Sequence, residues 1–197
     1  SQGERCVLLS ENRPEWLISD IAIMNAGGVT VPLFTTYSEK DYEYILNDCK
    51  PKICIVSNNT QLNKIKKFVS NEIKVLSIEN ISDKIESVEN ILNKNNSKSE
   101  LDFNKNIERK NLACIIYTSG TTGNPKGVEL THNNFKVELD SVGDVLKFAQ
   151  GDRYVSWLPL AHVFGQLVDN HYWVRRALHM SVVDSPLNTI DFAKEIQ

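Results

Sequence analysis

The sequence predicts an α/β fold in which mostly parallel sheets are flanked by helices. Short apolar runs alternate with longer segments in which apolar residues recur at helical spacing. Glycine, proline and asparagine separate many of these segments, as expected for turns. Alternating strands and helices favour a parallel sheet with right-handed crossovers. We find no internal repeat.

The first part of the chain gives strands and helices in strict alternation. Pro14 suits the first turn of a helix, and Gly27 with Gly28 ends that helix before the next strand. Ser38 is well placed to cap the following helix. Trp16 and its aliphatic neighbours are expected in the core. We expect strands at residues 6–10, 30–33, 53–57 and 74–78, and helices at residues 14–26, 39–48 and 61–70.

The later part repeats the alternation after a polar interval. Residues 81–110 are rich in Asn, Lys, Ser and Glu, which is typical of a solvated linker. Beyond it we expect strands at residues 112–117 and 128–131, then a helix near residues 134–148 capped by Thr131 or Asn133. A strand starting at Tyr154 is broken by Pro159, and a helix at 163–176, a strand at 180–183 and a helix at 186–196 follow. The expected organisation is a first lobe at residues 1–80, a linker at 81–110 and a second lobe at 111–197.

Composition indicates an ordinary globular protein. The 197 residues are 41% hydrophobic and 24% charged, and a net charge of -3 gives no electrostatic argument for nucleic acid. Every apolar run is shorter than the roughly 18 residues that span a bilayer, and no leader peptide opens the sequence. We therefore expect a soluble, cytoplasmic protein, with peripheral membrane association of a longer parent left open. The four cysteines lack the spacing of metal ligands and are expected to be reduced, buried thiols: Cys6, Cys49, Cys54 and Cys114.

One polar segment, residues 117–128, combines hydroxyls, glycines and a lysine in the way that a polyphosphate requires. Glycines let backbone N–H groups approach oxygen atoms closely, and the hydroxyls add donors. Lys126 supplies positive charge, and Pro125 restricts the backbone before it. The residues on either side of Lys126, Pro125 and Gly127, exclude a Walker A motif, which has glycine before the lysine and Ser or Thr after it. A hairpin is expected instead. The candidate binding residues are Thr118, Ser119, Gly120, Thr121, Thr122, Gly123 and Lys126.

This segment closely resembles the phosphate-binding signature of the adenylate-forming superfamily, whose members include acyl-CoA synthetases and aryl-CoA ligases. The resemblance implies that the loop holds the β- and γ-phosphates of ATP while a carboxylate attacks the α-phosphate, giving an acyl-adenylate and pyrophosphate. CoA then displaces AMP in most of the family. By the same resemblance, Lys126 is a catalytic residue and Thr118 is a candidate Mg²⁺ contact.

Two further segments extend the resemblance over most of the chain. Residues 3–56 are similar to the early strand-helix-strand region of the family, and residues 154–166 are similar to the motif that lines its acyl site. A histidine beside apolar residues is otherwise more often structural. The order Leu-Pro-Leu-Ala-His at residues 158–162 is closest to the long-chain fatty acyl-CoA synthetases. The resemblance implies that His162 lies near the substrate carboxylate, where it orients the carboxylate or gates the pocket.

The family elements that hold adenine and ribose, and the catalytic lysine of the mobile C-terminal domain, have no match here. We therefore expect part of the N-terminal domain of a larger synthetase, inactive in isolation, that uses a fatty acid, ATP and CoA. An aryl-CoA ligase or another carboxylate-adenylating enzyme stays open, as does a noncatalytic nucleotide-binding scaffold. Acyl chain length and oligomeric state are not determined by the sequence. Four aromatic residues are candidates for either a pocket or the core: Trp157, Phe164, Tyr172 and Trp173.

Overall fold

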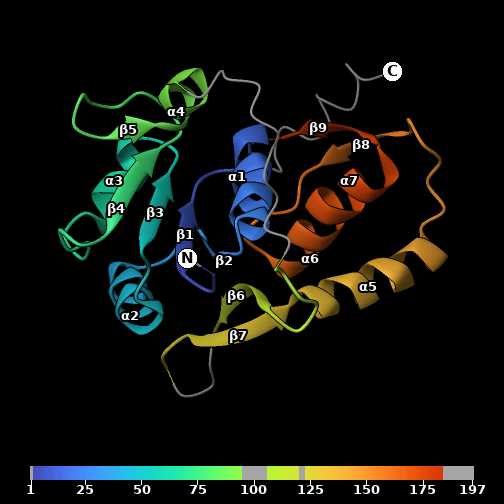
Figure 1. Ribbon diagram of the computed structural model, residues 1–197, viewed down its shortest axis with the longest axis horizontal. Helices are drawn as coiled ribbons and strands as arrows, with labels where there is room; N and C mark the ends of the chain where they lie inside the picture. The colour runs from blue at the N-terminus through green and yellow to red at the C-terminus, as the bar shows by residue number, and fades with distance from the viewer. Residues whose placement is uncertain (1, 95–105, 120–122, 184–197) are drawn as a thin grey trace.

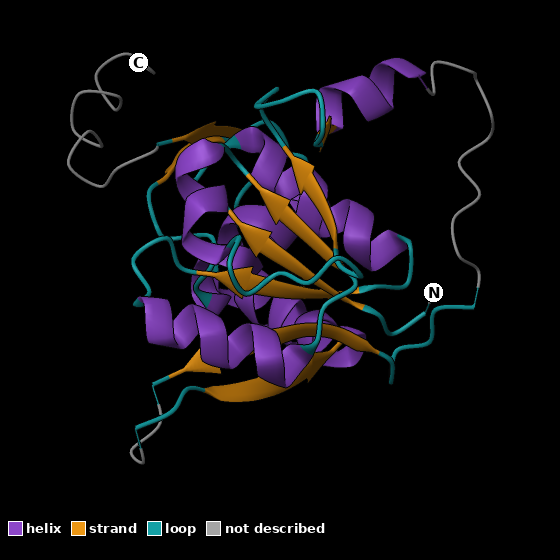
Figure 2. Cartoon of the chain, turned by 90° about the vertical axis from the view of Figure 1, so that its left-hand side faces the viewer, coloured by secondary structure: helices purple, strands orange, loops and turns teal. Residues whose placement is uncertain are grey.

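The computed structural model describes residues 2–94, 106–119 and 123–183 (Figure 1). These residues form a seven-stranded sheet with the order β5-β4-β3-β1-β2-β6-β7, and a separate pair, β8 and β9. All neighbouring strands are parallel except β6 and β7. Helices lie on both faces of the large sheet (Figure 2). The predicted fold class, mostly parallel sheets flanked by helices, is confirmed.

The first seven elements follow the predicted order. The predicted helix at residues 61–70 starts earlier, where Asn58 accepts a hydrogen bond from the backbone N–H of Gln61, and ends earlier, in a turn closed by the bond from Phe68 N–H to the Ile65 carbonyl. The bounds are β1 Arg5–Leu9, α1 Pro14–Asn25, β2 Val29–Leu33, α2 Glu39–Cys49, β3 Ile53–Val56, α3 Asn59–Ile65 and β4 Lys74–Ser77.

The expected linker at residues 81–110 contains regular structure, which corrects that prediction. β5 (Glu86–Ser87) extends the large sheet beside β4, and α4 (Val88–Lys94) follows. The Glu86 carboxylate forms ion pairs with Lys74 and Lys94. Some of the charged residues of the expected linker therefore interact with each other at the β4–β5 edge of the sheet. Residues 95–105, which include the most polar stretch, lie outside the described residues.

β6 (Leu112–Thr118) and β7 (Lys126–Thr131) join the sheet of the first lobe. β6 pairs with β2, with Cys114 opposite Thr30, so the expected boundary at residue 111 lies within a single sheet. Thr131 caps α5 (His132–Val145) by accepting from the backbone N–H of Asn134, which identifies Thr131 as the cap.

The remaining elements form the second sheet and its helix. β8 (Arg153–Ser156) is followed by α6 (Val163–Gly165), a π-helix η1 (Gln166–Tyr172), α7 (Trp173–Arg176) and β9 (His179–Val182). The single α-helix expected at residues 163–176 therefore contains a π-helical turn. The helix expected at residues 186–196 lies outside the described residues.

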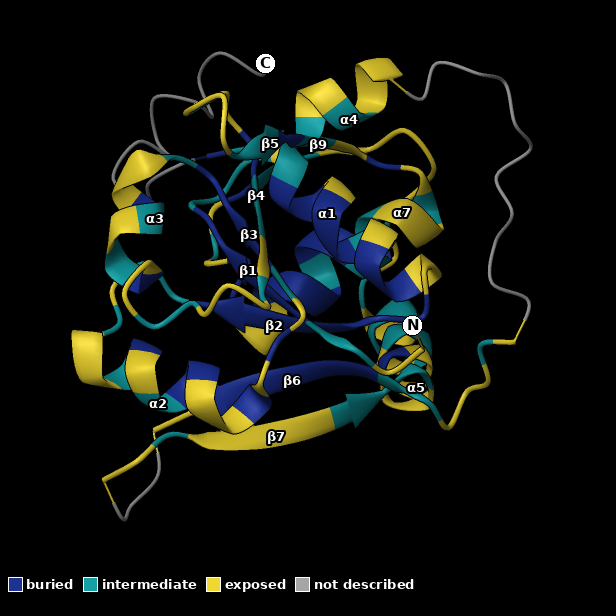
Figure 3. Cartoon of the chain, turned by 60° about the vertical axis from the view of Figure 1, so that its left-hand side comes forward, coloured by how far each residue is buried: buried dark blue, intermediate teal, exposed yellow. Residues whose placement is uncertain are grey.

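The core divides between the two faces of the sheet because side chains alternate along each strand. Val7 and Leu9 of β1 pack toward α2 and α3, whereas Leu8 packs with Trp16 of α1 and with Leu160. The inner strands are buried and β7 is largely exposed (Figure 3). Partly buried residues of β9 also pack against the α1 cluster, so α1 lies between the large sheet and the β8–β9 pair.

The four cysteines are buried as free thiols, as predicted. Burial raises the pKa of Cys49 and of Cys54 to about 12, so both remain protonated near neutral pH. Within the described ranges, no helix combines the length and apolar character needed to cross a bilayer.

Candidate functional site

The polar loop of the sequence closes a hairpin between β6 and β7. Thr118 and Lys126 form its last cross-strand pair, and both are exposed, as is Ser119. Gly123 has a φ of +100° with open space around it, so its backbone conformation is what favours glycine. The predicted hairpin is confirmed. Three residues of the loop lie outside the described residues: Gly120, Thr121 and Thr122.

The exposed groups at the mouth of this hairpin have no partner within the part of the chain that the structure describes. No hydrogen bond or ion pair there engages the ammonium group of Lys126 or the hydroxyl groups of Thr118 and Ser119. An ammonium group and hydroxyl groups are strong donors for anionic oxygens. The mouth of the hairpin therefore offers a cation and two donors to a ligand.

The base of the hairpin is fixed by Tyr117. Its buried hydroxyl donates to Asp48 at 2.5 Å, and its backbone carbonyl accepts from the Tyr37 hydroxyl at 2.9 Å. Burial, followed by the bond to Asp48, raises the pKa of Tyr117, which keeps this hydroxyl protonated. Gly127 lies opposite, where a Cβ would come within 3.2 Å of the tyrosine ring. The strand end before the loop is thus held from both sides.

His162 begins the short helix α6 and is exposed. Its backbone N–H donates to the Pro159 carbonyl at 2.9 Å, and its Nδ1 accepts from the Phe164 N–H at 3.2 Å. In the neutral imidazole the proton therefore lies on Nε2. A Cβ on Gly165 would approach the Pro159 carbonyl oxygen to 2.5 Å, so this tight turn requires glycine. The turn presents His162 with one defined tautomer.

A cavity of about 230 Å³ lies at the carboxyl ends of β1 and β2. Ligands of open α/β sheets bind at this edge. Because β6 is parallel to β2, Thr118 lies at the same edge, and His162 directly follows Ala161 of the cavity wall. No hydrogen bond or ion pair joins Lys126 to His162 within the described ranges. The lining residues are Ser10, Glu11, Asn12, Leu33, Phe34, Thr35, Thr36, Trp157, Pro159 and Ala161.

Glu11 bridges the carboxyl ends of β1 and β3. The chain leaves β1 for β2 on one side and then crosses to β3 on the other, so these ends form the switch point of the sheet. The Glu11 carboxylate accepts from Ser57 Oγ and from Gln61 Nε2, each at 2.5 Å. Burial alone would raise the pKa of Glu11, but these and other hydrogen bonds outweigh it and lower the pKa. No sequence motif predicted a role for Glu11.

A buried polar cluster joins α1 to the π-helix, and sequence reasoning missed it. Asp20 is fully buried and accepts from Asn170 Nδ2 at 2.7 Å and from Gln166 Nε2 at 3.1 Å. The signal that could have found it is an aspartate among the apolar residues of α1. π-Helical turns occur frequently near functional sites, and this one begins four residues after His162.

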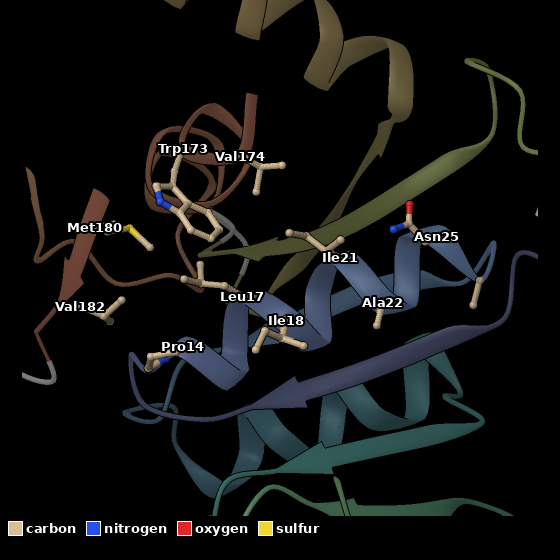
Figure 4. Close-up of a pocket in the computed structure, with 11 residues that line it drawn as sticks. Pro14, Leu17, Ile18, Ile21, Ala22, Asn25, Trp173, Val174, Met180 and Val182 are labelled. Carbon is tan, nitrogen blue, oxygen red and sulfur yellow. The ribbon is translucent and has the colours of Figure 1, made fainter. Parts of the chain in front are cut away.

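An apolar groove of about 680 Å³, larger than the 230 Å³ cavity, lies between α1, α7 and β9 (Figure 4). Trp173 lines this groove, Trp157 lines the smaller cavity, and Tyr172 is buried, so the four candidate aromatic residues do not share one pocket. Neither Lys126 nor His162 reaches the groove. Its walls are formed by Pro14, Leu17, Ile18, Ile21, Ala22, Asn25, Ala26, Trp173, Val174, Met180 and Val182.

Similar sequences are fatty acid–CoA ligases. The long-chain-fatty-acid–CoA ligase ACSBG2 of Gallus gallus is 34% identical over 179 residues, covering 82% of this chain and 23% of the relative. The same ligase of Xenopus laevis is 32% identical, covering 82% of this chain and 24% of the relative. Fatty acyl-CoA synthetase A of Dictyostelium discoideum is 33% identical, covering 85% and 27%. The chain thus spans about a quarter of the length of these relatives.

Solved structures of similar fold are also adenylate-forming enzymes. An ATP-bound crystal structure of MatB from Rhodopseudomonas palustris matches with a TM-score of 0.76 and 25% identity, over 93% of this chain and 35% of that one. VinN in complex with L-aspartate has a TM-score of 0.81 at 20% identity, covering 99% and 47%, which supports the fold alone. The model of the AMP-binding enzyme family matches residues 1–197. The chain belongs to the AMP-binding family of adenylate-forming enzymes.

Proposed function

We propose that this chain forms the phosphate-binding part of an AMP-forming fatty acid–CoA ligase with a preference for long-chain acids. The relatives named long-chain-fatty-acid–CoA ligases support the substrate class, as does the sequence of residues 158–162. Because the chain spans about a quarter of those relatives, the reaction is assigned to a longer parent protein. We place that parent in the cytoplasm.

The observation that carries the proposal is the hairpin mouth, where Thr118, Ser119 and Lys126 stand exposed without partners in the described ranges. Lys126 would meet the charge on the β- and γ-phosphates, and the hydroxyls would donate to phosphate oxygens. The residues between Ser119 and Lys126 match the family's phosphate-binding signature in sequence. Because Tyr117 fixes the base of the hairpin, little ordering of the strands is needed when ATP binds.

The residues present fit Mg²⁺ only as a partial site. Mg²⁺ takes oxygen ligands and usually keeps several waters and substrate phosphates, so the Thr118 hydroxyl is a suitable single protein ligand. Among the described residues no three acidic, histidine or cysteine side chains are grouped as a metal site. Held in part by the Thr118 hydroxyl, Mg²⁺ would supply positive charge that neutralises the pyrophosphate as it leaves.

His162 is assigned to the carboxylate. Its Nε2–H is left to donate because Nδ1 already accepts from Phe164. A carboxylate oxygen held this way attacks the α-phosphorus, the bond to pyrophosphate breaks, and an acyl-adenylate forms. The CoA thiolate then attacks the acyl carbonyl carbon, the new C–S bond forms, and AMP leaves with the electron pair of the acyl C–O bond. The role of His162 is to orient the nucleophilic carboxylate, while Lys126 stabilises phosphate charge.

Carboxylate-dependent exchange of pyrophosphate into ATP tests the proposal in the full-length protein. Exchange should be supported by palmitate and much less by benzoate. Exchange with benzoate alone would assign an aryl-CoA ligase. If ATP binds but no acid supports exchange, the chain belongs to a noncatalytic nucleotide-binding scaffold and the proposal is wrong.

A further inference from the structure

Asn12 connects the loop after β1 to the segment that carries His162. Its Nδ2 donates to the Leu158 carbonyl at 2.7 Å, and its Oδ1 accepts from the Leu160 N–H at 2.9 Å. One side chain thus binds the backbone on both sides of Pro159. The two segments lie about 150 residues apart in sequence, so the contact depends on the folded structure.

The connection continues from this segment to His162. The Pro159 carbonyl, between the two groups bound by Asn12, accepts the His162 N–H at 2.9 Å. Leu160 is fully buried with Trp16, which fixes how deeply the segment sits. Asn12 adds direction to this packing because an amide that both donates and accepts fixes the orientation of the backbone that it binds.

The segment after His162 is also fixed by hydrogen bonds. The Gln166 N–H donates to the His162 carbonyl at 2.9 Å, and the Gln166 side chain binds Asp20 of α1. The residues on the two sides of His162 are therefore held by different partners. Asn12, just before α1, binds the preceding segment, and Asp20, within α1, binds the following one. Asp20 is a fully buried carboxyl group with several hydrogen bonds, so its removal would disturb the core. Asn12 is half-buried and lines the cavity, so it is the anchor that substitution can test.

We propose that Asn12 is a positioning residue that sets the imidazole of His162 against the substrate carboxylate. The inference rests on the proposed function of His162. Losing both hydrogen bonds frees the backbone before the histidine and displaces its imidazole, and a displacement of about 1 Å can cost a reaction about 100-fold. Among the described residues no hydrogen bond joins Asn12 to the β6–β7 hairpin, so we expect ATP recognition to be independent of Asn12.

A double-mutant cycle in the full-length protein tests this. Wild type, Asn12→Ala, His162→Ala and the double variant are compared by palmitate-dependent pyrophosphate exchange. We expect Asn12→Ala to lower kcat/KM for palmitate by about 10- to 100-fold, with KM for ATP changed by less than about 2-fold. In the His162→Ala background the same substitution should change kcat/KM by less than about 3-fold, because the two residues act as a unit. Asn111→Ala, which removes the acceptor of two hydrogen bonds at the opposite end of β6, should leave the kinetics unchanged.

The outcomes distinguish a positioning role of Asn12 from a general structural role. An equal loss from Asn12→Ala with and without His162, or a parallel rise in KM for ATP, would assign Asn12 a general structural role and overturn the inference. No effect of His162→Ala would refute both the inference and the proposed role of His162. If Asn12→Ala does not fold, as judged by thermal unfolding, Asn12→Asp replaces it in the cycle. That variant keeps the acceptor for Leu160 N–H and loses the donor to Leu158, so the same coupling to His162 is expected.

Discussion

Asp169 shows how a single buried carboxyl makes the stability of this fold depend on pH. It lies in the π-helix, where Ser156 Oγ donates to it at 2.7 Å. Burial raises the pKa of Asp169 to about 6 from an ordinary 3.8, although the bond from Ser156 opposes the shift. The folded state therefore binds this proton more tightly than the unfolded chain does. Its contribution to stability is complete below pH 3.8 and is lost as the pH rises through 6.

Asp169→Asn should remove this pH dependence. Each pKa unit corresponds to about 1.4 kcal/mol, so the wild type should lose up to about 3 kcal/mol of unfolding free energy across the window. The variant should lose less, because an amide does not ionise and its oxygen still accepts from Ser156. Thermal unfolding of both proteins between about pH 3.5 and about pH 7.5, which covers the whole window, measures the difference. Parallel pH profiles would show that Asp169 is not the responsible group.

At the residue scale, local sequence was enough to select Lys126 and His162 as candidates but not the residues that hold His162 in place. Both candidates stand in short motifs whose residue types indicate their chemistry. Asn12 and Asp20 bind partners about 150 residues away, and no local pattern predicts which distant backbone an amide or carboxylate will meet.

At the element scale, the β6–β7 hairpin depends on a close fit between Tyr117 and Gly127. A Cβ at Gly127 would lie 3.0 Å from Ile115 Cγ2 and 3.2 Å from the tyrosine ring. Gly127→Ala should therefore destabilise the protein by about 1–3 kcal/mol, as overpacking does. Gly143 of α5 is the matched control because only the flexible end of Arg176 comes within 3.3 Å, and Gly143→Ala should stabilise by about 0.5–1 kcal/mol. Urea unfolding measures both, and equal effects would contradict the packing argument.

Tyr117→Phe separates the polar anchor of the hairpin from its packing. The ring opposite Gly127 is kept, but the hydrogen bond to Asp48 is lost, which should cost about 1–3 kcal/mol because the Asp48 carboxyl loses its donor. KM for ATP should rise in the full-length protein, since the strand end before the phosphate loop becomes less constrained. If stability falls while KM for ATP stays constant, the anchor serves folding alone.

The helix after His162 shows where element prediction failed. Apolar spacing predicted one α-helix over residues 163–176, but residues 166–172 form a π-helix. Gln166 and Asn170 both reach Asp20 in this arrangement. A hydrophobic pattern reports which face of a helix is buried, but it carries no information about a buried carboxylate on another helix that polar side chains must satisfy.

At the scale of the whole molecule, the sequence predicted the fold class but not the division of the chain. The β6–β7 hairpin pairs with β2 and belongs to the same sheet as β1 to β4, and β5 adds residues from the expected linker. Strand pairing depends on partners distant in sequence, and composition alone could not reveal it. Under the proposed function this pairing with β2 matters, because it brings the β6–β7 hairpin to the sheet edge that holds the cavity and the His162 segment.

The isolated chain should not make acyl-CoA. It spans about a quarter of the ligases that it resembles, and under the proposed function the rest of the substrate site comes from other parts of the parent. With ATP, Mg²⁺, palmitate and CoA, AMP should stay at the level of a buffer control while the parent turns over. Sustained AMP production by the purified chain would mean that these residues contain a complete active site.

Binding of ATP to Lys126→Ala tests the central claim, that the β6–β7 hairpin holds the nucleotide phosphates. Isothermal titration of the full-length protein, with Lys40→Ala as an exposed lysine control on α2, measures affinity without requiring turnover. Charge-assisted contacts contribute about 1.5–3 kcal/mol, so Lys126→Ala should weaken ATP binding by about 10- to 150-fold and AMP binding far less, while Lys40→Ala binds both like the wild type. Unchanged ATP affinity in a folded Lys126→Ala protein would contradict the account.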